Sequence, residues 1–168
     1  MKRIIFVLRA LLILPCVLLP LISCTSKSTK AQLVDGKLQA CPGSPNCVSS
    51  ESEDASSRVA PLVFQGPPEI AWERLKEAIR DMGGEIQKER DSYLWSTFTT
   101  RVFRFVDDVE FRMVATNGII HVRSASRKGY SDFGVNRKRV EKFRVRFNRK
   151  KDQTVGQQTH PADVQQRR

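Results

Sequence analysis

The residues most capable of chemistry in this sequence form a basic segment with interspersed serines and a glycine. Arginine suits phosphate and carboxylate binding because its planar guanidinium offers a bidentate donor fork. Serine hydroxyls can add hydrogen bonds, and a helix that starts in this segment would present free amides to an anion. We therefore predict an anion-binding site, although the arginines could instead pair with nearby acidic residues and hold the loop against a sheet. The candidate residues in this segment are Arg123, Ser126, Arg127, Ser131 and Arg137.

A hairpin predicted around Asn117-Gly118 adds Arg112 to this site. A two-residue turn fixes the strand register, and this register places Arg112 directly across from Arg123. Like charges in that position are unfavourable. Either Glu110 or a bound anion should therefore offset them.

The acidic and histidine residues nearby do not indicate catalysis. Asp107 and Asp108 would point to opposite faces of a strand, and aspartate favours turns, so we expect a turn between two strands there. His121 has no second histidine or cysteine at metal-ligand spacing, and no Gly-x-Ser-x-Gly elbow supports a serine hydrolase. We assign no catalytic residue, no metal and no cofactor.

Two cysteines, Cys41 and Cys47, enclose a short segment with two prolines. In an oxidising compartment they are expected to form a disulfide. A zinc site is the alternative, but the two cysteines are further apart than the usual ligand spacing.

The N-terminus is typical of a bacterial lipoprotein signal. A basic start is followed by 13 largely apolar residues, 10–22, and then by Ser23 and Cys24. This run is shorter than the ~20 residues that span a bilayer, so residues 1–23 are interpreted as a cleaved signal. The expected product is lipidated on Cys24 and held in the bacterial cell envelope by its lipid. Thr25 in place of aspartate predicts delivery to the outer membrane, facing the periplasm, in a Gram-negative cell.

Cleavage would leave 145 of the 168 residues, enough for one domain with tails. The signal carries Lys2, Arg3 and Arg9 and no acid, so its removal lowers the formal net charge from +11 to +8. This charge favours anionic partners, and outside the cytoplasm it makes nucleic acid an unexpected one. We predict a polar tether over 24–40, a globular domain over 41–149 and a disordered tail over 150–168.

The hydrophobic periodicity predicts an α+β domain. Trp72, Leu75 and Ile79 recur at helical spacing, and the period then changes to two. We expect an antiparallel, meander-like sheet of about five strands with two helices packed on its apolar face. The predicted strands are 85–89, 93–99, 101–106, 109–115 and 119–125, and the predicted helices are 67–82 and 134–147.

Three blocks, at 41–50, 105–111 and 123–141, resemble the signature blocks of the bacterial and plastid family called domain of unknown function 1499. The resemblance implies one domain that includes the cysteine segment, frequently behind an export or lipoprotein signal. It implies no activity and no catalytic residue.

These observations favour a non-enzymatic envelope lipoprotein. Its basic loop and sheet face would bind an anionic lipid headgroup, a lipopolysaccharide phosphate or an acidic glycan or other acidic polymer. One alternative is a hydrolase or transferase that acts on a phosphorylated or acidic envelope substrate. Another is a structural partner of a second envelope protein. No oligomeric state follows from the sequence.

The lipid anchor is directly testable. Radiolabelled palmitate should mark the wild-type chain but not the Cys24→Ser variant, because only the cysteine sulfur can carry the lipid. Label on the serine variant would contradict the assignment.

Overall fold

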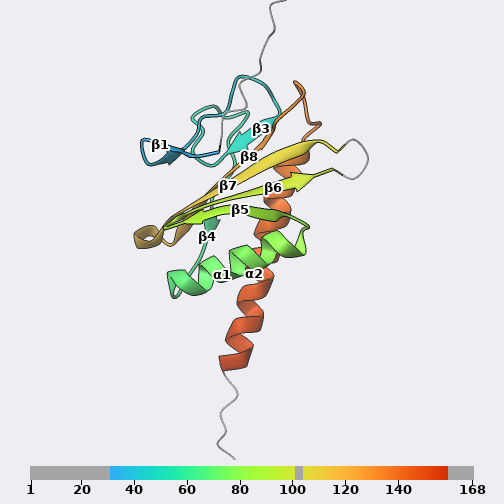
Figure 1. The fold of residues 1–168 in the computed structure, drawn as a ribbon. Helices are drawn as coiled ribbons and strands as arrows, with labels where there is room; N and C mark the ends of the chain where they lie inside the picture. Colours follow the sequence, from blue (N-terminus) through green and yellow to red (C-terminus); the bar gives the residue numbers. More distant parts are fainter. Residues whose placement is uncertain (1–30, 101–103, 159–168) are drawn as a thin grey trace, which may run out of the picture.

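The structure, a computed structural model, describes residues 31–100 and 104–158, with the backbone alone for 150–158. The predicted fold class is confirmed: an antiparallel sheet carries two helices (Figure 1). The sheet runs in the order β3(Cys47–Ser49), β8(Ile119–Ser126), β7(Val106–Val114), β6(Tyr93–Thr99), β5(Glu85–Arg90), and β4(Leu62–Val63) also pairs with β8.

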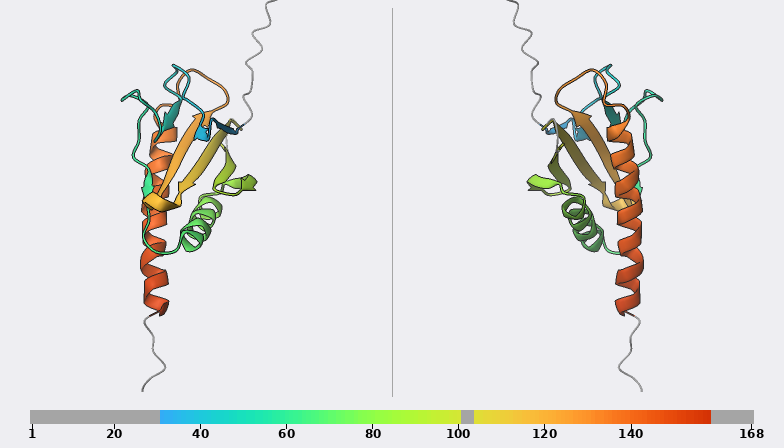
Figure 2. Two further views of the ribbon diagram at one scale, coloured as in Figure 1. Left: turned by 90° about the vertical axis from the view of Figure 1, so that its left-hand side faces the viewer. Right: turned by 90° about the vertical axis from the view of Figure 1, so that its right-hand side faces the viewer.

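The two helices, α1(Pro68–Asp81) and α2(Val135–Gln158), pack with one face of the sheet (Figure 2). Their buried residues follow the predicted helical spacing, with Leu75 and Ile79 in α1 and Phe143 in α2 fully buried. Phe143 meets the ring of Phe111 on β7 edge to face, at 5.2 Å between centroids. Burial of each such side chain contributes about 1.5–3 kcal/mol, so this layer supplies most of the hydrophobic stabilisation.

The described part of the segment predicted as a tether, residues 31–40, contains two strands. β1(Leu33–Val34) and β2(Lys37–Leu38) form a two-stranded hairpin, and Leu38 is buried. The turn is Asp35-Gly36, and both residues have positive φ, which is the backbone that a tight Asp-Gly hairpin needs. The tether prediction is therefore wrong for residues 31–40.

The turn between β7 and β8 also differs from the prediction. Ala115–Asn117 form a short 3-10 helix, and Gly118 follows in the left-handed region. The strands pair Val114 with Ile119, so the register is shifted by two residues from that of a two-residue turn.

This shift keeps each side chain on its predicted face, because side chains alternate with a period of two. It changes the cross-strand partners, however. Arg123 lies opposite Glu110 and Arg112 lies opposite His121. The predicted arginine pair, and the repulsion argued from it, are therefore wrong.

Two other boundaries differ from those predicted. Asp107 and Asp108 lie inside β7 and not in a turn, and residues 104–105 precede that strand. The last helix continues to Gln158, beyond the predicted end at 147 and into the segment expected to be disordered.

Several predictions fall outside the described residues. These are the signal over 1–23, the lipidated Cys24, residues 101–103 of a predicted strand and residues 159–168 of the tail. In the part of the chain that the structure does cover, no helix is both long and apolar enough to cross a membrane.

Gly118 provides a test of the observed turn. A Cβ added there would lie 2.8 Å from the carbonyl oxygen of Phe64, and the φ of +62° is strained for alanine. Gly36 has a similar φ of +73° with open space around it. Both alanine variants should lose about 1 kcal/mol from the left-handed backbone. Gly118→Ala should lose more in urea unfolding because of the added contact, and equal losses would contradict the described turn.

Candidate functional site

Acidic side chains from β7 project to both faces of the sheet, and each meets an arginine. Asp107 faces α2, where Arg139 donates to its Oδ2 at 2.5 Å. Asp108 and Glu110 face the other side, which we call the outer face. A carboxylate removed from water needs a paired charge and hydrogen bonds, and β7 obtains both from arginines on other elements.

Glu110 is the centre of the outer face and is fully buried. The Tyr93 hydroxyl donates to its Oε1 and Arg123 Nη1 donates to its Oε2, each at 2.8 Å. Burial raises the pKa of Glu110 although Arg123 opposes the shift. Burial and the adjacent carboxylate also raise the pKa of Tyr93, so the phenol remains a donor.

Beside this pair, Asp108 binds Arg127 through two hydrogen bonds of 2.8 and 2.9 Å. The Trp95 indole nitrogen donates to the same carboxylate at 2.8 Å. The hydrogen bonds to Asp108 raise the pKa of Arg127. This carboxylate therefore accepts three hydrogen bonds, and Trp95 is a fluorescent group in direct contact with it.

At the other end of the outer face, Glu51 binds Arg112 and accepts from the Leu38 amide. His121 lies 3.1 Å from the Ser50 hydroxyl, but its other ring nitrogen is 3.8 Å from Glu51, beyond hydrogen-bond distance. Burial lowers the pKa of His121.

This serine-histidine contact does not have the geometry of a nucleophile. The Ser50 oxygen accepts from the Val122 amide at 2.9 Å. The pocket described below is lined by neither Ser50 nor His121. The contact therefore joins the segment after β3 to β8.

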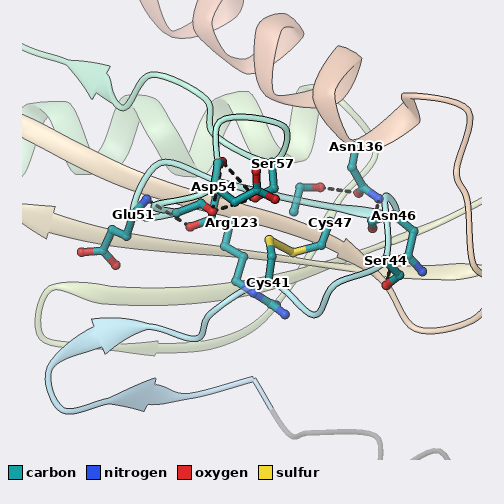
Figure 3. The surroundings of a disulfide bond; sticks show 12 residues. Cys41, Ser44, Asn46, Cys47, Glu51, Asp54, Ser57, Arg123 and Asn136 are labelled. Carbon is teal, nitrogen blue, oxygen red and sulfur yellow. Dashed lines mark hydrogen bonds between the residues drawn. A yellow bond between two sulfur atoms is a disulfide. The ribbon is translucent and has the colours of Figure 1, made fainter.

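The α2 side holds a second polar network. Asn136 is fully buried and donates to the Asn46 carbonyl and to the Ser126 hydroxyl, while Ser124 donates to it. Arg139 Nη1 donates to the Ser124 hydroxyl at 3.1 Å. The network ties the cysteine segment, β8 and α2 together (Figure 3).

The outer face carries a pocket of about 650 Å³ below the cysteine segment. Cys41 and Cys47 form the predicted disulfide, with 5.6 Å between their Cα atoms. Figure 3 shows the Arg123 side chain beside this bond. The pocket is lined by Gln39, Ala40, Cys41, Pro42, Ser44 and Asn46 on one side and by Asp108, Arg123, Ala125, Ser126, Arg127, Lys128 and Gly129 on the other.

Arg123 is the notable group of this pocket. The residue is only 8% exposed, and its Nε is among the buried side-chain nitrogens of the described chain that have no hydrogen-bond partner. A buried donor without an acceptor costs roughly 1–3 kcal/mol. The same arginine lines the pocket.

The structure brings together three of the predicted anion-binding residues. Arg112, Arg123 and Arg127 share the outer face, and each has an acidic partner. Ser126 turns toward α2 to bind Asn136. Of the six predicted residues, Arg123, Ser126 and Arg127 line the pocket, whereas Arg112, Ser131 and Arg137 do not.

Arg137 binds instead the backbone carbonyls of Arg58 and Ser56, at 2.9 and 2.6 Å. Ser131 accepts from the Phe133 amide. Asp132 caps α2 by accepting from the amides of Gly134 and Asn136.

Lys128 and the lining residues between 39 and 46 were not predicted to form part of the pocket. Their only signal was membership of two separate basic and cysteine-containing blocks. Among the residues with described side chains, no group of three or more potential ligands could hold a metal ion.

Comparison with protein families gives one match. Residues 37–147 match the family described as Protein of unknown function (DUF1499). Curated proteins and solved structures give no match.

The raised pKa of Glu110 predicts a pH dependence of stability. The folded state holds this proton to a higher pH than the unfolded chain. Titration of Glu110 should therefore destabilise the fold as the pH rises from near its ordinary value through its folded value. Urea unfolding from pH 4 to pH 8 should show wild type losing stability relative to Glu110→Gln. A difference that does not vary with pH would contradict this assignment.

Proposed function

The chain belongs to the DUF1499 family, and we propose that it is a non-enzymatic envelope lipoprotein whose domain binds an anionic group in the pocket below the disulfide. The observation that carries the proposal is the buried Arg123 with an unpartnered Nε at this pocket. The lipid on Cys24 would hold the domain at a membrane.

The charges around the pocket support an anionic ligand. Glu110 and Asp108 already neutralise Arg123 and Arg127. Lys128 adds a positive charge at the same pocket and is exposed. An anion in the pocket would lie near the Arg123 guanidinium and near the exposed Lys128 ammonium. The ion pair with Glu110 would hold the arginine in place.

The same pocket offers little to a hydrolase or transferase. Its acidic side chain, Asp108, accepts three hydrogen bonds from Trp95 and Arg127. A general base needs a free lone pair within reach of the substrate. These contacts favour binding over catalysis.

The proposal can be tested through Trp95, which contacts Asp108 at the pocket. The full chain should change its tryptophan emission when titrated with inorganic phosphate or with phosphatidylglycerol vesicles. The change should be absent from a Trp95→Phe variant. A response to vesicles and not to free phosphate would identify a lipid headgroup as the source of the anion.

Lys128→Gln should weaken this binding and flatten its salt dependence, because it removes charge at the pocket without breaking an ion pair. Lys88→Gln is the matched control, since Lys88 is an exposed lysine on β5, away from the pocket. Arg123→Gln should abolish binding, but it also leaves Glu110 buried without its charge partner. The double variant Glu110→Gln/Arg123→Gln removes that difficulty. Unchanged affinity in the Lys128 and double variants would overturn the proposal.

A further inference from the structure

The loop between β8 and α2 exposes two aromatic side chains. Tyr130 is 75% exposed and Phe133 is 90% exposed, although both are large enough to bury substantial apolar area. Val135, at the start of α2, is 43% exposed beside them. Exposed apolar side chains grouped within six positions of the chain suit an interaction surface.

The loop is also positively charged. Lys128 and Lys138 are exposed on either side of the aromatic residues. Arg137 is bound to backbone carbonyls, so no acid neutralises it in the described contacts. Asp132 is the acid within the loop and caps α2. Aromatic tips flanked by basic residues match the interface of an anionic bilayer, where rings enter the headgroup layer and cations meet lipid phosphates.

The position of the loop in the molecule fits the same partner. β1, the cysteine segment and this loop lie toward one end, and the C-terminal part of α2 lies at the other (Figures 1 and 2). The described chain begins at Ala31, just before β1. The chain that precedes it therefore joins the molecule at the end that carries the aromatic loop.

We infer that residues 127–135 dock this domain on an anionic phospholipid bilayer, with Phe133 and Tyr130 in the headgroup layer. The inference rests on the proposed lipid at Cys24. Ala31 is seven positions after Cys24, and seven residue steps reach at most about 25 Å. A domain held on so short a connection meets the bilayer with its N-terminal end, which carries the exposed rings. Because Lys128 and Gly129 also line the pocket, docking places that pocket next to lipid phosphates.

The experiment uses the full chain in vesicles of phosphatidylcholine and brominated phosphatidylglycerol. Phe133→Trp places an indole on the loop, and Val145→Trp places one at a 55% exposed site along α2 as the matched control. The native Trp72 and Trp95 are present in all three proteins. Phe133→Trp should show emission shifted to shorter wavelength and quenching by the brominated lipid beyond that of wild type, whereas Val145→Trp should show neither.

Palmitate labelling of the same preparations distinguishes failure of loop docking from failure of the lipid anchor. A labelled, vesicle-bound chain in which the new loop tryptophan is unquenched would overturn loop docking and leave the lipid anchor standing. An unlabelled chain would overturn the anchor and the docking inference with it. Equal quenching of both tryptophans would also overturn the inference, because it would mean that the domain contacts lipid without a preferred face.

Discussion

Charge compensation on β7 is the constraint on which the structure depends. The strand lies inside the sheet and carries three carboxylates, two of them almost fully buried. Each is held by an arginine from β8, the following loop or α2. Removal of one partner from a buried pair costs about 3–5 kcal/mol. These three arginines are thus first a requirement of the fold, and only the donors that their ion pairs leave free are available to a ligand.

This surplus is unevenly distributed. Arg139 and Arg127 bind their acids and neighbouring groups with several donors, whereas Arg123 has one bond to Glu110 and a buried nitrogen without an acceptor. The binding hypothesis therefore depends on the unpartnered Nε of Arg123 and not on net charge. A basic surface alone would suit many partners, but one fixed guanidinium below a disulfide-bonded loop restricts the ligand by shape.

Local patterns predicted most of the fold. Helical spacing located α1, and period-two alternation located β6 and β8, because these signals depend on neighbours in sequence. The strand register predicted from Asn117-Gly118 was wrong by two residues, because the chain forms a 3-10 turn there. The site was less predictable, since Glu51 reaches Arg112 and Asp107 reaches Arg139 only through tertiary packing. Sequence proximity placed Ser131 and Arg137 in the same site, although neither lines the pocket and Arg137 binds carbonyls of the 56–58 segment.

The contacts of Asn136 have a consequence for the order of folding. This one amide bonds residues as far away as Asn46, 90 positions earlier in the chain. Contacts of such long sequence separation form late, because loop closure must precede them. The sheet and the cysteine segment can therefore reach their final arrangement only after α2 has docked. A chain that lacked this helix would expose the Phe111 surface and would be prone to aggregation.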